Sequence, residues 1–290
     1  MMVETFRHAA VMLEVAVPSI HTWILNLYES NRLLPRCCRL HPFLRLPSWP
    51  ISIAMAAANG TSTTKPVLFF DVDNCLYPMS TKVHDLMVEL IDKYFVKHLD
   101  LPVAEATRLH QEYYTNYGLA IEGLVRHHQI DPLEYNAKVD DALPLENVIK
   151  PDPELRKLLE DIDKTKVKTW LFTNAYVNHA KRVVRILGIE DLFDGLTYCD
   201  YAAQPIVCKP RREMYDKAML EAGAERAADC FFVDDSYPNC SKAQDFGWTA
   251  VHLVEDEMPL LKTPASQYQI RHLSELRTIF PQFFKSTTPQ

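Results

Sequence analysis

Short apolar segments alternate with longer amphipathic segments from Lys65 onward, and this alternation constrains the fold more than any other feature of the chain. The expected strands are residues 66–71, 167–173, 195–199, 229–234 and 248–254. The expected helices between them are residues 151–163, 176–187, 211–222 and 237–246. Strands that alternate with helices predict a parallel sheet covered by helices on both faces, which is a doubly wound α/β fold.

Proline and glycine mark the ends of these expected helices. Pro210 is expected in the first turn of a helix, where the N–H group that proline lacks is not needed. Gly188, Gly223 and Gly247 lie just past three helix ends, where glycine readily adopts the left-handed conformation that terminates a helix. These signals support the helix assignment independently of the apolar pattern.

One connection is too long for a simple strand–helix–strand unit. Residues 72–166 separate the first two expected strands, whereas a complete crossover needs only about 10–12 residues. Residues 80–140 within this connection read as helical, with apolar side chains at helical spacing at Val83, Leu86, Met87, Leu90 and Ile91. We expect residues 79–148 to form a helical cap inserted into an α/β core of residues 65–78 and 149–290. Such a cap would exclude water from a site beneath it.

The first expected strand leads directly into two carboxylates. Residues 67–70 have the composition of a buried strand, and Asp71 and Asp73 follow where the strand gives way to a loop. In open α/β sheets ligands bind at the carboxyl ends of the strands, and two acids placed there need a cation. An Asp-x-Asp sequence taken alone is equally typical of an Asx-turn or a helix N-cap, and alone we would favour that interpretation.

Polar residues also follow three later strands. Thr173 and Asn174 follow the second strand and are expected to open a helix, where they can bind a phosphate or simply cap the helix. Lys209 follows the third strand, and its ammonium group can neutralise phosphate charge or lie exposed on the surface. Asp234 and Asp235 end the fourth strand and repeat the arrangement of the first.

Two acidic clusters at neighbouring strand ends would repel each other unless a divalent cation lies between them. Oxygen ligands, with water completing an octahedron, favour Mg²⁺. The sequence therefore predicts a magnesium site formed by four acids, at Asp71, Asp73, Asp234 and Asp235.

These motifs resemble, in their order and positions, the four motifs of haloacid dehalogenase-like hydrolases, whose core is Rossmann-like. The resemblance covers about residues 66–254 and is carried by Asp71-Val72-Asp73-Asn74, Thr173, Lys209 and Asp234-Asp235. Further segments resemble the pyrimidine 5'-nucleotidases of fungi and plants. They are Tyr77-Pro78, residues 117–124 and 130–136 with His128, and Thr173-Asn174-Ala175.

The resemblance implies an aspartyl-phosphate mechanism. Asp71 would attack phosphorus, while Asp73 would protonate the leaving oxygen and later deprotonate the hydrolytic water. Thr173 and Asn174 would bind the non-bridging oxygens, and Lys209 would offset the charge that develops on them.

The resemblance also implies how Mg²⁺ would be held: by the Asp71 carboxylate, the Asp73 backbone carbonyl and Asp235, with Asp234 close by. Asn239 replaces an Asp that some members of the family carry, so we expect it to act only indirectly. A halide leaving group needs no acid whereas an alkoxide does, so Asp73 favours phosphoester hydrolysis over dehalogenation.

Three functions stay open at this stage. The first is a 5'-nucleotidase acting on UMP and CMP, for which the resemblance adds nicotinamide mononucleotide as a substrate. The second is a phosphatase for another small phosphomonoester, such as a sugar phosphate, pyridoxal phosphate or lysophosphatidate. The third is a catalytically idle interaction protein on the same fold. The candidates for base recognition are Tyr113, Tyr117, Glu122, His127 and His128. Residues of these types at helical spacing are equally typical of the packed core of a cap.

Composition narrows the partners and the compartment. The net charge of -7 and the scattered basic residues argue against nucleic-acid binding. The partner that the resemblance implies is a small-molecule phosphomonoester substrate. The 7 cysteines form no Cys-x-x-Cys pair, which suits a reducing compartment, so we expect a cytoplasmic location, with the nucleus as the alternative. Cys75, beside the expected nucleophile, is a candidate for oxidation. Nothing in the sequence indicates an oligomeric state.

Residues 1–64 differ in character and are expected to be an extension without a fold of its own. Residues 9–28 are apolar but interrupted by Glu14, Pro18 and His21, so we expect no membrane span. Arginines follow this stretch rather than precede it, which disfavours a secretory signal, and its acidic residues oppose a mitochondrial presequence. We favour a translation start at Met55.

Overall fold

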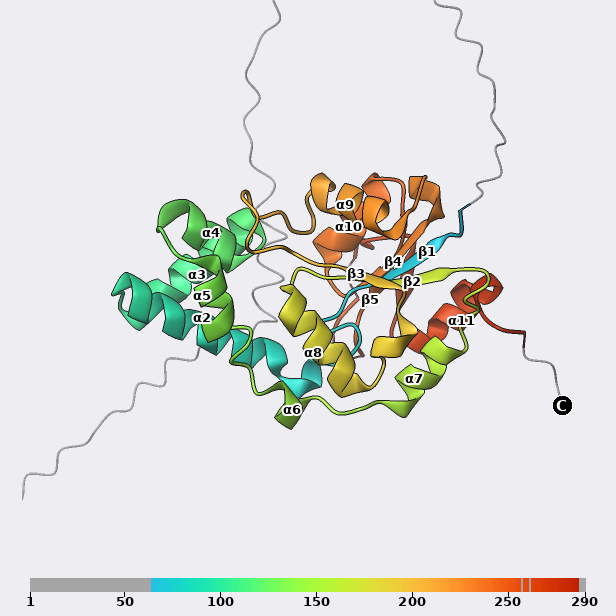
Figure 1. Ribbon diagram of the computed structural model, residues 1–290, viewed down its shortest axis with the longest axis horizontal. Helices are drawn as coiled ribbons and strands as arrows, with labels where there is room; N and C mark the ends of the chain where they lie inside the picture. The colour runs from blue at the N-terminus through green and yellow to red at the C-terminus, as the bar shows by residue number, and fades with distance from the viewer. Residues whose placement is uncertain (1–63, 257, 261, 287–290) are drawn as a thin grey trace, which may run out of the picture. The chain divides into compact units, whose positions relative to one another are not determined.

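Six strands among the described residues form a sheet in the computed structural model, in the order β3-β2-β1-β4-β5-β6 (Figure 1). The structure describes residues 64–256, 258–260 and 262–286. The strands are β1 (Val67–Phe70), β2 (Lys168–Phe172), β3 (Gly195–Thr197), β4 (Cys230–Asp234), β5 (Thr249–Leu253) and β6 (Tyr268–Ile270). All neighbouring strands pair in parallel, so the predicted parallel α/β fold is confirmed.

Helices cover both faces of this sheet, as the alternating pattern predicts (Figure 1). Side chains of β1 alternate between the two faces: Leu68 and Phe70 pack with α7 and α8, whereas Val67 and Phe69 pack with α9 and α10. The helices are α7 (Pro153–Glu160), α8 (Val177–Leu187), α9 (Arg212–Ala222), α10 (Tyr237–Asp245) and α11 (Leu276–Ile279). The continuous apolar run of β1 fits this position, because both of its faces are buried.

Short 3-10 turns complete this part of the chain. They are η2 (Met79–Thr81), η3 (Glu190–Leu192), η4 (Ala227–Asp229), η5 (Leu273–Glu275) and η6 (Pro281–Phe283). Gly188 and Gly223 end α8 and α9 in the left-handed conformation, with φ of 70° and 69°, and Gly247 follows α10 with φ of 88°. These three expectations are confirmed.

The expectation for Pro210 is wrong. A turn closed by the Arg211 N–H group on the Cys208 carbonyl comes first, and α9 begins only at Arg212. Pro210 therefore lies in this turn, before the helix.

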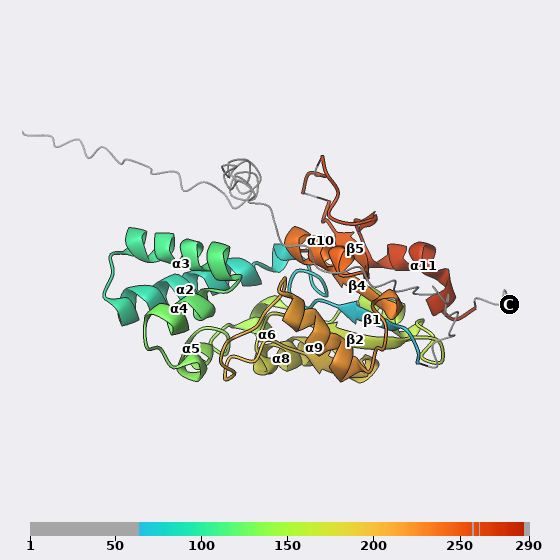
Figure 2. The ribbon, with the colours of Figure 1, turned by 90° about the horizontal axis from the view of Figure 1, so that it is seen from above.

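The long insertion between β1 and β2 is helical, as expected for residues 80–140. It contains α2 (Val83–Leu99), α3 (Val103–Tyr117), α4 (Ala120–His127), α5 (Pro132–Lys138) and the short α6 (Leu145–Val148). Helices α2 and α3 lie side by side and run in opposite directions (Figure 2). Contact analysis assigns the described residues to one compact unit, so the cap boundaries at residues 79 and 148 stay a prediction.

The expectations for the N-terminal region, including residues 9–28 and a start at Met55, lie outside the described residues. Within the described residues, every helix is too short or too polar to cross a membrane.

Candidate active site

Three carboxylates meet at the carboxyl ends of β1 and β4. The two strands are neighbours in register, and the Asp71 N–H group donates to the Val233 carbonyl oxygen at 2.9 Å. One oxygen from each of Asp71, Asp234 and Asp235 lies within 4.8 Å of the others. We call these three residues the carboxylate cluster. The structure thus brings together three of the four acids predicted for the metal site, while the Asp73 side chain lies outside this cluster.

Lys209 is the cation of the site and is fully buried, with 1% of its surface exposed. Its ammonium group donates to Asp71 Oδ1 at 2.6 Å, to Asp234 Oδ2 at 2.7 Å and to the Phe172 carbonyl oxygen at 2.8 Å. All three donors of the ammonium group are therefore used. Burial lowers the pKa of Lys209, but the two carboxylates outweigh burial and raise it.

The cluster holds more negative charge than Lys209 can balance. Burial, together with Asp234 and Asp73, raises the pKa of Asp71 to about 7, although Lys209 opposes the shift. Burial and the charges of Asp234 and Asp71 raise the pKa of Asp235 well above its usual value. A divalent cation would reverse these shifts by supplying the missing positive charge. The all-oxygen donor set suits Mg²⁺.

The Asp73 carboxylate makes a separate set of contacts. Its Oδ1 atom accepts hydrogen bonds from the Tyr77 hydroxyl at 2.5 Å and from His179 Nε2 at 2.6 Å. Burial raises the pKa of Asp73, but His179 and Tyr77 outweigh burial and lower it. His179 was not predicted from the sequence, because a histidine in the first turn of a helix has no distinguishing pattern.

Thr173 and Asn174 lie in the loop between β2 and α8, not at the start of the helix. Helix α8 begins at Val177 with Tyr176 as its N-cap, so the expectation that Thr173 opens the helix is wrong. The Thr173 hydroxyl instead accepts a hydrogen bond from the Ala175 N–H group at 3.0 Å, which closes a short turn. The phosphate-binding role of both residues stays a prediction.

The Asn174 side chain hydrogen-bonds both backbone polar groups of Lys209. Its Oδ1 atom accepts from the Lys209 N–H group at 2.7 Å, and its Nδ2 atom donates to the Lys209 carbonyl oxygen at 3.0 Å. Asn239 acts similarly on Asp234, donating to both of its carboxylate oxygens at 3.2 and 3.1 Å. His252 contacts the Asp235 carbonyl oxygen at 2.9 Å. These side chains hold the charged residues of the site in place.

Comparison with known proteins agrees with this geometry. A family model described as haloacid dehalogenase-like hydrolase matches residues 66–247. The chain belongs to the haloacid dehalogenase-like hydrolases. The matched range contains all of the residues that surround the carboxylate cluster except His252.

A curated relative and two solved structures are similar to this hydrolase. Phosphate metabolism protein 8 of Saccharomyces cerevisiae is 44% identical over 201 residues, which are 66% of this chain and 63% of the yeast protein. The matched region thus spans less than two thirds of that relative. The HAD phosphatase from Thermococcus onnurineus has a TM-score of 0.52 and 17% identity, covering 74% of this chain and 97% of its own. The putative HAD-hydrolase YfnB from Bacillus subtilis has a TM-score of 0.51 and 16% identity, covering 74% and 98%. These two structures share the fold.

The predicted base-recognition residues of this hydrolase mostly contact one another. The Tyr113 hydroxyl pairs with His128 Nε2 at 2.7 Å, and the Tyr117 hydroxyl pairs with His127 Nε2 at 2.7 Å. Buried Glu122 accepts from Arg126 at 2.6 Å and lies 3.5 Å from Arg211 of the core. Their described contacts are those of a packed cap.

The C-terminal end of α3 lies against the loop that carries Lys209. The Cys208 thiol donates to the Tyr117 carbonyl oxygen at 3.5 Å, and a Cβ atom at Gly118 would lie 3.1 Å from the Cys208 sulfur. Tyr114, one turn earlier, exposes 54% of its surface. Partial burial and the charges of Asp235 and Asp234 raise the pKa of its hydroxyl. Tyr114 thus lies within electrostatic range of the carboxylate cluster, although the sequence did not single it out.

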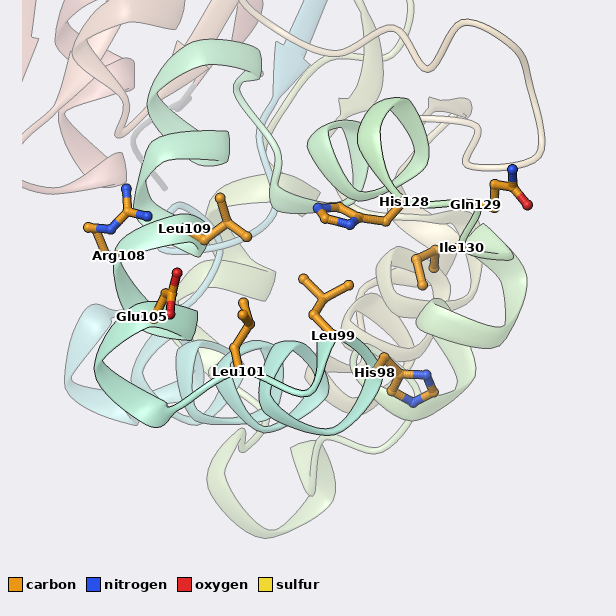
Figure 3. Close-up of a pocket in the computed structure, with 9 residues that line it drawn as sticks. All are labelled: His98, Leu99, Leu101, Glu105, Arg108, Leu109, His128, Gln129 and Ile130. Atoms are coloured by element: carbon orange, nitrogen blue, oxygen red, sulfur yellow. The ribbon is translucent and has the colours of Figure 1, made fainter.

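A separate cavity of about 500 Å³ lies within the cap, between the C-terminal end of α2, the first half of α3 and the loop after α4 (Figure 3). Leucine and isoleucine side chains line it together with four charged or imidazole groups. The lining residues are His98, Leu99, Leu101, Glu105, Arg108, Leu109, His128, Gln129 and Ile130. None of the predicted catalytic or metal-binding residues is among them.

Cys75 is unsuited to oxidation. Its side chain is buried, with 4% exposed, and burial together with the charges of Asp71 and Asp234 raises its pKa well above the usual value. Because the thiolate is the reactive form, a thiol in this environment is inert.

Proposed function

We propose that this hydrolase is a magnesium-dependent phosphatase of small phosphomonoesters, with pyrimidine nucleoside 5'-monophosphates such as UMP and CMP as its preferred substrates. The observation that carries the proposal is the carboxylate cluster with buried Lys209 at one edge of the sheet, and a second acid, Asp73, two residues beyond the proposed nucleophile. This set provides a nucleophile, an acid and a cation site within one small region.

Asp71 is the proposed nucleophile. Its carboxylate would attack phosphorus while the bond from phosphorus to the ester oxygen breaks, and Asp73 would give its proton to that departing oxygen. Asp73, now ionised, would then take a proton from the water that attacks the aspartyl-phosphate. Phosphate leaves and the Asp71 carboxylate is restored.

Lys209 and Mg²⁺ would share the task of neutralising charge. Asp71 and Asp235, with the Asp73 backbone carbonyl, would hold the ion, with Asp234 close by, and the ion would supply positive charge next to the phosphate. Lys209 already bridges Asp71 and Asp234, so it holds the nucleophile in place. Thr173, buried at the end of β2, would offer its hydroxyl to a phosphate oxygen.

The choice of substrate rests on the cap. The resemblance of residues 117–124 and 130–136 to pyrimidine 5'-nucleotidases favours a nucleotide, and half-exposed Tyr114 offers an aromatic surface for a base. We propose that residues 79–148 act as the cap that covers the bound nucleotide. The name of the yeast relative, a phosphate metabolism protein, agrees with a phosphomonoester substrate.

We also infer that the protein works in the cytoplasm. The five cysteines that lie within the described residues are free and buried, at positions 75, 199, 208, 230 and 240, as suits a reducing compartment.

A panel of phosphomonoesters tests the proposal. Purified protein is assayed for phosphate release from p-nitrophenyl phosphate with Mg²⁺ and with EDTA, and then with UMP, CMP, AMP, glycerol phosphate, pyridoxal phosphate and lysophosphatidate. We expect magnesium-dependent turnover with the highest kcat/KM for UMP and CMP. Equal rates across the panel would remove the pyrimidine preference, and no release from any substrate would favour an interaction protein.

A further inference from the structure

The carboxylate of Asp73 is held by only one of its two oxygens. Tyr77 and His179 both donate to Oδ1, at 2.5 and 2.6 Å. Among the described residues, no side chain donates a hydrogen bond to Oδ2, and the Asp73 side chain is 27% exposed. The two donors therefore leave Oδ2 as the oxygen that can face a substrate.

His179 reaches Asp73 from the interior of the protein. It lies in the first turn of α8, on the face of the sheet that also carries α7 (Figure 1), and none of its side chain is exposed. If His179 only filled space in the core, it would not need a carboxylate partner, yet it contacts Asp73, 106 residues away in the sequence. A buried histidine that served only to fill space would be replaceable by leucine at little cost to the chemistry.

A second carboxyl group lies near this histidine. Asp140, with 3% of its surface exposed, follows α5 on the segment that leads from the cap back to β2, and it lies within electrostatic range of His179. Tyr201 lies close to this carboxyl group. His179 Nδ1 and Asp140 Oδ2 are both buried and lack a hydrogen-bond partner within the described part of the chain. Of the two carboxyl groups, His179 thus contacts only that of Asp73, while Asp140 acts on it through its charge.

We propose that His179 is a positioning residue for the general acid: by fixing Oδ1 of Asp73 together with Tyr77, it directs Oδ2 toward the leaving oxygen of the substrate. The inference rests on the proposed phosphatase function. In the first half-reaction the O–H bond at Oδ2 breaks and its proton passes to the ester oxygen, which keeps the electron pair of the broken bond to phosphorus. In the second half-reaction Oδ2 takes a proton from the attacking water.

This role predicts an effect that depends on the leaving group. A nucleoside leaves as an alkoxide and needs a proton, whereas p-nitrophenolate is stable near neutral pH and needs little help. Misplacing the acid should therefore slow UMP hydrolysis far more than p-nitrophenyl phosphate hydrolysis. A histidine that only stabilised the fold would slow both reactions alike.

The experiment compares His179→Leu, which removes the donor, with His179→Gln, whose side-chain amide can still donate to Asp73. We expect kcat for UMP to fall about 10²-fold in His179→Leu, within the usual contribution of general acid catalysis, with a much smaller fall for p-nitrophenyl phosphate. His179→Gln should recover part of the lost rate on UMP. Tyr77→Phe, which removes the other donor to Oδ1, should show the same selectivity and keeps the test valid if His179→Leu does not fold.

Two further variants decide the interpretation. His110→Leu is the matched control, because His110 is a buried cap histidine that contacts the carboxylate of Asp92 at 2.8 Å, and it should leave the ratio of the two rates unchanged. In an Asp73→Asn background, His179→Leu should cause no further loss on UMP, because both changes act on one group.

The possible failures differ from one another. An inactive wild-type protein would overturn the proposed function and this inference with it. An active wild-type protein whose His179 variants lose the same factor on both substrates, or lose further rate in the Asp73→Asn background, would overturn the inference alone.

Discussion

The three acids of the carboxylate cluster have a single ammonium group among them, which contacts two of the three. In the helical insertion, by contrast, the buried carboxylate of Glu122 pairs with the guanidinium groups of both Arg126 and Arg211. The first arrangement is short of positive charge, and the pKa of Asp71 rises to about 7 as a result of burial and its acidic neighbours. In the second arrangement the protein itself supplies more than enough positive charge, with two guanidinium groups for one carboxylate. The contrast is that the buried acids at the sheet edge lack enough positive charge from the protein, whereas the buried acid of the helical insertion has it.

The largest expected effect on catalysis comes from neutralising the proposed nucleophile of the carboxylate cluster. Asp71→Asn should lower kcat by about 10³-fold or more, because an amide cannot form the phosphorylated intermediate. The fold should survive, since the change removes a buried charge. Phosphate release and circular dichroism measure the two effects. Asp216→Asn, on the exposed face of α9, is the control, and appreciable turnover in Asp71→Asn would rule out a covalent intermediate at this residue.

The second test removes the cation of the cluster. Lys209→Met leaves Asp71 and Asp234 buried without their shared partner, so the free energy of unfolding in EDTA should fall by about 3–5 kcal/mol. Urea unfolding measures this loss. Lys157→Met removes an exposed ion pair with Asp161 and should change stability by only about 0.5 kcal/mol. Equal losses in the two variants would show that the cluster does not depend on Lys209.

The third test addresses the cap. Glu122→Ala should lower the free energy of unfolding by about 1–3 kcal/mol, because two guanidinium groups lose their buried acceptor. The rate on p-nitrophenyl phosphate should change little compared with the loss in Asp71→Asn. Glu112→Ala, which breaks an exposed pair with Arg108, should cost about 0.5 kcal/mol at most. A collapse of catalysis in Glu122→Ala would mean that the cap charge also serves the reaction.

The smallest expected effect is a pH dependence of the free energy of unfolding, caused by the buried carboxyl group of Asp140. Burial raises the pKa of Asp140 from 3.8 to about 6, so the folded protein keeps a proton that the unfolded chain has already released between these values. This group therefore lowers the free energy of unfolding as the pH rises through about 4 to 6. Asp140→Asn should be more stable than the wild type at neutral pH by about 1–2 kcal/mol and nearly equal near pH 4. Urea unfolding at both pH values measures this, and a variant less stable at neutral pH would contradict it.

Much of the architecture could be predicted because buried parallel strands have a strong local signature. Strands β1 to β5 were located by their apolar runs, and the glycines at 188, 223 and 247 marked three helix ends. Strand β6 was missed, because its sequence Tyr-Gln-Ile is not an apolar run. The position of Pro210 was wrong because a short local turn over Cys208 to Arg211 precedes α9 and delays its start to Arg212.

The candidate site divides in the same way. The meeting of Asp71, Asp234 and Asp235 could be anticipated, because parallel neighbouring strands bring their carboxyl ends to one edge of the sheet. The hydrogen bonds from Asn174 to the Lys209 backbone could not be anticipated from the sequence. Neither could the hydrogen bond between His179 and Asp73. These contacts join residues from separate elements through side-chain directions that no local pattern records.

The amino-acid sequence by itself determined the parallel sheet, the insertion after the first strand and the acids at two strand ends. These properties follow from the polarity and periodicity of neighbouring residues, which act over a few positions of the chain. Only the tertiary structure decided which polar groups are satisfied and which are left for a ligand. That outcome depends on packing between elements far apart in the sequence, since the pKa of a buried charge is set by whatever lies around it in space.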